Sequence, residues 1–221
     1  MNEVVVNVPS TVKNDYNGFS FFAQLAHDVS YHCKSKIILN FKKTRWFEAN
    51  LVSILGAIVQ NSKKSFDCKF VIRNINKSIK SVFMKNGFYE YFNLETEEDY
   101  YDSTIKFKVF SVKEEDNFAD YITKDVIPKI RLDLKDPVVK SFKSSLNEVF
   151  VNVGLHANCE NVYTCGQYYH THQKVCFTIT DIGNTIGDKV REKYGSSDLT
   201  DQSAINWATK EGNTTKEVEE P

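Results

Sequence analysis

Short apolar runs alternate with helical periodicities along the first 90 residues. The runs at Val4–Val8, Lys36–Phe41 and Phe70–Ile72 have the length and composition of buried strands. Three further groups of apolar residues recur every three or four positions, as on one face of a helix. These groups are Phe22, Leu25, Ala26 and Val29, then Ala49–Val59, then Ile75, Ile79, Val82 and Phe83. Strands that alternate with helices predict a parallel or mixed sheet with helical cover.

The pattern after residue 104 predicts two strands and three helices. Alternating apolar residues indicate strands at Ile105–Val109 and Val175–Thr180, and the second strand runs into Asp181-Ile-Gly183. A helix near Phe118 should end or kink at Pro128. Asp136-Pro137 opens a longer helix, and a short one follows near the end of the chain. The apolar faces of these last two helices are Phe142, Leu146, Val149, Phe150 and Val153, and then Ala204, Ile205 and Ala208.

An acidic segment separates the two patterns. Residues 94–103 carry no apolar periodicity, and we place a domain boundary there. The prediction is an α/β chain of the α+β kind with two domains, residues 1–100 and 101–221. A length of 221 residues is enough for two small cores.

Composition narrows the classes of function. The formal net charge is −1, so no overall basic field points to nucleic acid or to an anionic membrane as a partner. No apolar run approaches the ~20 residues of a membrane helix, and the N-terminus is too short and too acidic for a signal peptide. We therefore expect a cytoplasmic protein, in which the five cysteines are reduced.

A polar stripe on the long predicted helix is the first candidate for chemistry. Glu148, Asn152 and His156 are spaced four residues apart, so they lie on one side of a helix. A carboxamide oxygen can bind Mg²⁺, which prefers oxygen ligands, and a carboxylate can activate a water molecule. By itself this spacing is also typical of a solvated helix edge.

The second candidate is the end of the strand that runs into Asp181-Ile-Gly183. An Asp at a strand end can point its carboxylate into a pocket, and the following Gly lets the backbone approach a ligand closely. The exocyclic amino group of adenine is a donor that this carboxylate can accept. An ordinary Asp-x-Gly turn is the alternative.

Together the two segments resemble the N box and the first glycine box of the GHKL ATPases, the class of histidine-kinase-like ATP-binding domains. The boxes are here Ser145–Ala157 and Ile179–Val190, and the resemblance covers roughly residues 105–216, including a lid-like segment at 204–216. It implies an α/β sandwich that binds Mg²⁺ and ATP. Asn152 would be the Mg²⁺ ligand, Glu148 the catalytic base, and Asp181 and Gly183 the adenine-binding residues.

The sequence departs from the GHKL pattern in two places. Thr185 stands at the second glycine position of the first box, where a Cβ could disturb the turn. No Gly-x-Gly-x-Gly box follows, and in the family that box opens the helix that holds the phosphates. We therefore expect weak nucleotide binding and little turnover.

The first hundred residues resemble a STAS domain, the fold of bacterial anti-sigma-factor antagonists. The resemblance rests on the order of strands and helices, above all Lys36–Phe41, Ala49–Val59 and Phe70–Ile72. Antagonists of that type carry a phosphorylatable Ser where the middle helix starts, and no Ser of the segment Trp46–Ser53 matches it cleanly. The resemblance implies an interaction or regulatory domain.

Three functions remain open at this point. The first is a bacterial regulatory protein that binds ATP and Mg²⁺ with slow or no hydrolysis, together with a protein partner or a second copy of itself. The second is a Ser/Thr protein kinase of the anti-sigma type, and the third is an interaction scaffold with a degenerate nucleotide site. A structural zinc site is disfavoured, because the zinc-type ligands of one short stretch are irregularly spaced: His156, Cys159, Cys165, His170, His172 and Cys176.

Overall fold

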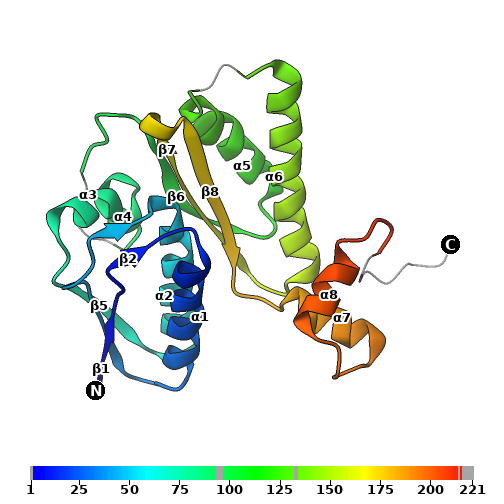
Figure 1. The fold of residues 1–221 in the computed structure, drawn as a ribbon, viewed down its shortest axis with the longest axis horizontal. Helices are drawn as coiled ribbons and strands as arrows, with labels where there is room; N and C mark the ends of the chain where they lie inside the picture. The colour runs from blue at the N-terminus through cyan, green and yellow to red at the C-terminus, as the bar shows by residue number, and fades with distance from the viewer. Residues whose placement is uncertain (1, 93–96, 132–133, 214, 216–221) are drawn as a thin grey trace.

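Two three-stranded sheets organise the chain, one parallel and one antiparallel (Figure 1). The computed structural model describes residues 2–92, 97–131, 134–213 and 215. The mixture of helices and strands confirms the predicted α+β character. No helix in these ranges combines the length and the apolar composition that crossing a membrane requires.

The first region holds the parallel sheet, in the order β1-β3-β5, and a small parallel pair, β2-β4. Its elements are β1 (Glu3–Asn7), β2 (Thr11–Val12), α1 (Tyr16–Ser30), β3 (Lys36–Asn40), β4 (Trp46–Phe47), a 3₁₀ turn (Ala49–Leu51), α2 (Val52–Phe66), β5 (Lys69–Arg73), α3 (Lys77–Lys85) and α4 (Phe88–Tyr91). The strands are in register, with Val5 opposite Ile38 and Ile38 opposite Val71. The apolar pattern predicted all three strands of the β1-β3-β5 sheet and three of the four helices, but not the short pair β2-β4 or helix α4.

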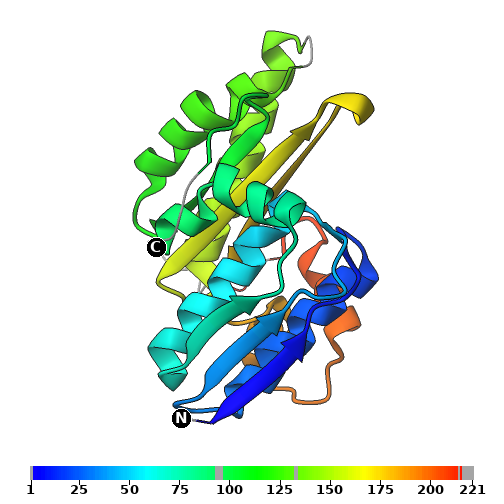
Figure 2. The same ribbon diagram turned by 90° about the vertical axis from the view of Figure 1, so that its left-hand side faces the viewer.

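Local capping fixes where the helices of this region begin. Asp15 caps α1, because its Oδ1 accepts a hydrogen bond from Gly18 N at 2.9 Å, and Asn76 caps α3 in the same way through Ile79 N. The apolar faces of α1 and α2 pack with the inward-facing strand residues, among them Leu39, into one core. Figure 2 shows the three parallel strands side by side with these helices behind them.

The second region holds the antiparallel sheet, in the order β6-β7-β8. Its elements are β6 (Thr104–Ser111), α5 (Glu115–Tyr121), a π-helical turn (Ile122–Val126), a 3₁₀ turn (Ile127–Lys129), α6 (Asp136–His156), β7 (Asn161–Tyr169), a 3₁₀ turn (His170–His172), β8 (Lys174–Asp181), α7 (Ile186–Tyr194) and α8 (Asp201–Ala208). Helices α5 and α6 cover one face of the sheet. Their core includes Phe118 and Phe150, whose rings stack with centroids 4.3 Å apart.

The other face of the antiparallel sheet packs on the first region. Phe107, Tyr163 and Cys165 of β6 and β7 belong to the same buried cluster as Leu55 of α2 and Phe88 of α4. The sheet is therefore sandwiched between α6 on one side and α2 on the other. The division into domains 1–100 and 101–221 stays a prediction, and apolar residues from both sides of it share one core.

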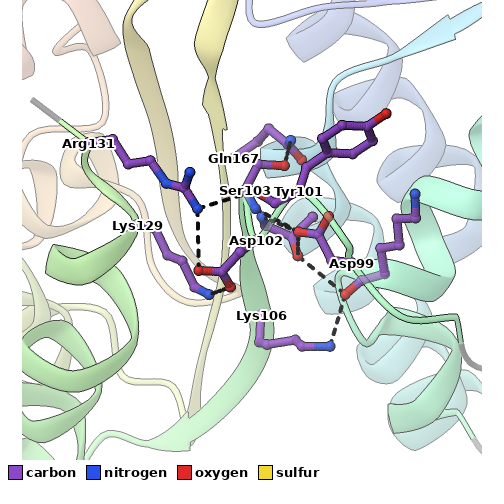
Figure 3. Close-up of polar contacts among 10 residues, drawn as sticks. Asp99, Tyr101, Asp102, Ser103, Lys106, Lys129, Arg131 and Gln167 are labelled. Atoms are coloured by element: carbon purple, nitrogen blue, oxygen red, sulfur yellow. Dashed lines mark hydrogen bonds and ion pairs between the residues drawn. The ribbon is translucent and has the colours of Figure 1, made fainter.

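The acidic segment between the sheets is held by hydrogen bonds (Figure 3). The Asp99 carboxylate accepts from Ser103 N at 2.7 Å, Thr104 N at 2.7 Å and Thr104 Oγ1 at 2.8 Å. Burial raises the pKa of Asp99, but these hydrogen bonds outweigh it and leave the pKa below its usual value. Residues 94–96 of the predicted boundary lie outside the described ranges.

Side chains also connect this segment to its surroundings. Asp102 forms ion pairs with Lys129 and, at 3.6 Å, with Arg131 (Figure 3). Lys106 Nζ donates to the carbonyl oxygen of Lys85 at 2.9 Å, across the predicted boundary. The connection between the sheets is therefore structured where it is described, and it does not have the character of a free linker.

Candidate functional site

Helix α6 carries the first group of predicted site residues. Pro137 lies in its first turn, and its apolar face packs on the antiparallel sheet through Phe142, Leu146, Phe150 and Val153. Phe150 is fully buried. This face and its extent agree with the prediction from the 3.6-residue period, except that Val149 is 46 % exposed.

Glu148 and Asn152 lie on the solvent side of α6. Each is two residues from the buried Phe150, and two residues rotate a side chain by about 200° around a helix axis. Both residues are exposed, and neither makes a hydrogen bond or an ion pair with the part of the chain that the structure describes. His156, the third member of the stripe, is half-buried, and its Nδ1 lies 3.0 Å from Thr215 Oγ1.

Asp181 ends β8 and is paired with Val162 of β7. Strand residues alternate between faces, and Ile179 packs in the core under α6 whereas Thr180 contacts α2, so Asp181 lies on the α6 side. Its Oδ1 accepts a hydrogen bond from Gly183 N at 3.0 Å. Its Oδ2 makes no hydrogen bond and no ion pair with the described residues, so one carboxylate oxygen is available to a ligand.

The surroundings of Asp181 disfavour its charge. Partial burial raises the pKa of the carboxyl group, and the hydrogen bond from Gly183 N opposes this effect only in part. Among the described residues, no cation compensates the burial. The Cys159 thiol is close enough for the charge of Asp181, after burial, to raise its pKa as well. A half-buried carboxylate without a cationic partner suits a neutral N–H donor.

Gly183 clamps the loop after β8 to the end of α6. A Cβ on Gly183 would overlap the carbonyl oxygen of Ala157, the residue that ends α6. The next residue, Asn184, donates its backbone N–H to that same carbonyl at 2.6 Å. The structure thus brings the end of the first predicted box against the middle of the second, and Ala157 is a contact that the sequence pattern did not indicate. The role of Gly183 beside an adenine ring stays a prediction.

Thr185 does not disturb the turn, contrary to the concern raised by its place in the sequence. Its φ of −73° is ordinary for a residue with a Cβ, and it caps α7, a helix that the apolar pattern did not predict. Thr185 Oγ1 accepts from Asp188 N at 3.1 Å, and Asp188 Oδ2 accepts from Thr185 N at 3.0 Å. These reciprocal bonds form a capping box, so a polar residue here begins a helix.

Helices α7 and α8 pack mainly on each other beyond this loop. Arg191 pairs with Asp188 and Asp201 at 2.8 Å each, and Tyr194 contacts the edge of Trp207. The resemblance implied a lid over part of this segment, at residues 204–216, of which 214 and 216 lie outside the described ranges. The contact between Thr215 and His156 brings its end back to α6.

None of three clefts formed by the described residues has Glu148, Asn152 or Asp181 in its wall. The largest, about 500 Å³, is apolar and lies between α2 and β5, and the second, about 450 Å³, surrounds Asp99 and Asp102. The third, about 220 Å³, lies between the last turns of α2 and the loop from α6 to β7, and Ile182, next to Asp181, is also in its wall. None of these three clefts is therefore a nucleotide pocket around the three predicted residues.

The described residues offer no cluster of three or more His, Cys, Asp or Glu side chains that could hold a metal ion. Cys165 of β7 packs in the shared core. Cys165 is fully buried, and burial raises the pKa of its thiol to about 12. A Mg²⁺ ion bound by Asn152, the predicted ligand, would therefore take most of its other ligands from a nucleotide's phosphates and from water.

Comparison with known proteins adds no family: no family model, no curated protein and no solved structure matches the chain. The functional assignment therefore depends on the residues and their geometry.

Proposed function

We propose that this chain is a bacterial regulatory protein that binds adenine nucleotides together with Mg²⁺, at the end of β8 and beside α6, with slow or no hydrolysis. The observation that carries the proposal is the Asp181 carboxylate. It is half-buried at a strand end, it lacks a cationic partner, and its Oδ2 is unused by the described residues.

The chemistry of Asp181 favours adenine over guanine. Adenine presents an exocyclic amino donor, which an ionised carboxylate accepts. Guanine presents a carbonyl oxygen at the corresponding ring position, and two acceptors repel each other. The negative charge of Asp181 is half-buried, and the hydrogen bond from Gly183 N compensates it only in part. This also favours a ligand that donates a hydrogen bond, because such a bond stabilises the ionised carboxylate.

The order of elements supports the same reading. Helix α6 precedes the β7–β8 hairpin, the Asp181–Gly183 loop follows, and two short helices come next. This is the order that the GHKL resemblance implies for the N box, the first glycine box and the lid. The clamp between Gly183 and Ala157 holds the first two segments against each other.

The positions of Glu148 and Asn152 argue for slow turnover. A catalytic base must reach the water that attacks the phosphate, and a Mg²⁺ ligand must reach the phosphates. Both side chains lie on the solvent side of α6 without a partner in the described ranges. They would meet a nucleotide only if its phosphates lay along the outer face of the helix.

The alternative of an interaction scaffold with a degenerate site is favoured by one observation. None of the three clefts holds the candidate residues together. The kinase alternative requires transfer of phosphate to a protein, which incubation with γ-labelled ATP and candidate partner proteins would detect.

A thermal-shift titration tests the proposal. A ligand that binds only the folded state raises the melting temperature by mass action. We expect Mg²⁺-ATP and ADP at millimolar concentration to raise it and GTP to leave it unchanged. No shift with either adenine nucleotide would reject the proposal in favour of the scaffold.

A further inference from the structure

We propose that Asn50 and Ser53 are positioning residues for the adenine site. Their hydrogen bonds to β8 lie on the face of the sheet opposite Asp181, and they fix the position of Asp181 relative to the first region. This inference rests on the proposed function for its consequence, nucleotide affinity. Its structural part, control of the Asp181–Gly183 loop by α2, stands independently.

Strand β8 needs support because it is an edge strand. Among the described strands it pairs only with β7, so its other backbone edge has no ladder of hydrogen bonds to a neighbour. The placement of an edge strand then depends on what its side chains contact on the two faces of the sheet. Ile179 packs on the α6 side, and Thr178 and Thr180 face α2.

Two side-chain hydrogen bonds join α2 and the turn before it to β8. Asn50 Nδ2 donates to Thr178 Oγ1 at 2.8 Å, and Ser53 Oγ lies 3.3 Å from Thr180 Oγ1. Asn50 is 1 % exposed and Ser53 0 % exposed, while Thr178 and Thr180 are half-buried, so water has only restricted access to these bonds. Ser53 Oγ also donates to the Asn50 carbonyl at 2.9 Å, which links the two contacts.

The contact between Ser53 and Thr180 lies next to Asp181, the predicted adenine-binding residue. Thr180 precedes Asp181, and the two side chains point to opposite faces of the sheet. A rotation or shift of Thr180 therefore moves the Asp181 carboxylate. Beyond Thr180, the 220 Å³ cleft separates α2 from Ile182. The bond to Ser53 is thus the last side-chain hydrogen bond between α2 and β8 before the loop.

The contact is polar and incompletely satisfied. Asn50 Oδ1 is buried and has no hydrogen-bond partner among the described residues. A buried acceptor without a partner is unfavourable, so this contact is less strongly held than an apolar one of the same area.

Thr180→Val tests the inference, because it removes the hydroxyl while keeping the shape of the side chain. We expect ADP to bind three- to tenfold more weakly. We also expect the backbone amides of residues 181–183 to exchange hydrogen faster in the nucleotide-free protein. Thr180→Ser, which keeps a hydroxyl, should restore most of the affinity and of the protection.

Ser62→Ala is the matched control. Ser62 is also buried on α2, but its hydroxyl donates to the Ile58 carbonyl within the helix and does not reach the sheet. It should lower stability by a similar amount without changing ADP affinity or exchange at residues 181–183.

Two results would distinguish a failure of the positioning role from a failure of the proposed function. If Thr180→Val lowers the melting temperature but changes neither ADP affinity nor exchange at residues 181–183, the contact is only structural and the positioning role is wrong. If the unmodified protein binds no adenine nucleotide, the proposed function fails. The exchange measurement then still decides whether α2 controls the loop.

Discussion

The two regions of the molecule use their buried polar groups in opposite ways. In the first region, Asn50 and Ser53 are buried and their hydrogen bonds hold neighbouring elements together. In the second, Asp181 is half-buried, its charge is disfavoured, and one of its oxygens is unused. A half-buried carboxylate with one unused oxygen is a stronger sign of a ligand than a hydroxyl such as that of Ser53, whose contacts lie within the fold.

The regions also differ in charge. Residues 1–92 contain 13 Lys and Arg against six Asp and Glu, whereas residues 93–221 contain 15 against 23. The net charge of −1 for the whole chain hides this division, and the basic region is the one without a candidate ligand residue. An anionic nucleotide therefore meets an acidic region, where recognition has to come from the base and from Mg²⁺.

The shared core gives the largest expected effect. Phe83 is fully buried in the first region, and Phe83→Ala should cost about 3–5 kcal/mol of unfolding free energy. Since the same cluster includes Phe107, Tyr163 and Cys165, hydrogen exchange should accelerate in β7 as well as in β3. Acceleration confined to β3 would mean that the regions unfold independently.

The contact between Gly183 and Ala157 gives the second-largest expected effect. Gly183→Ala places a Cβ against the Ala157 carbonyl, so we expect a loss of about 1–3 kcal/mol and a displaced loop. Adenine-nucleotide binding should weaken at least tenfold. Gly154→Ala, within α6, is the control and should be neutral or stabilising by about 0.5–1 kcal/mol, as for other helical glycines. Unfolding curves and ADP titrations measure both, and unchanged ADP binding in Gly183→Ala would separate the clamp from the site.

Asn152→Ala should have a smaller effect, confined to the metal. If Asn152 binds Mg²⁺, the variant should lose about tenfold in ATP affinity with Mg²⁺ present, equivalent to ~1.4 kcal/mol. With EDTA the two proteins should bind alike, and stability should not change because the side chain is exposed. Equal losses in both conditions would refute the metal role.

The pH dependence of Asp181 is the smallest effect. Its carboxylate must be ionised to accept the adenine donor, and burial raises its pKa above the ordinary 3.8. Adenosine affinity should therefore be constant at neutral pH and fall as the pH decreases through this raised value. The folded state holds the proton more tightly than the unfolded state, so the group makes the fold less stable as the pH rises. A flat affinity profile in the unmodified protein would contradict the assignment.

Periodicity predicted much of the fold, and burial on both faces explains part of what it missed. Helices α2 and α6 and strands β3 and β8 were identified because each carries a clear apolar pattern. Strand β7 was not, since Val162–Gly166 are all buried between α2 and α6 and show no alternation. Helix α7 was not predicted because it is defined by the capping box of Thr185 and Asp188 rather than by an apolar face.

The site was predictable only as separate segments. Spacing placed Glu148 and Asn152 on one side of a helix and Asp181 at a strand end, as found. It could not show that Ala157 meets Gly183, or that Ser53 meets Thr180 across 127 positions, because such contacts depend on how the sheets pack. Sequence also could not show that the outer face of α6 carries Glu148 and Asn152 without partners in the described ranges.

The most direct test of the account is calorimetric titration of ADP and GDP into the unmodified protein and into Asp181→Asn. The account predicts measurable binding of ADP, none of GDP, and loss of ADP binding in Asp181→Asn with the fold intact, because Asn keeps the acceptor for Gly183 N. Equal binding of ADP by both proteins, or equal binding of ADP and GDP, would contradict the assignment of Asp181 as the adenine-binding residue.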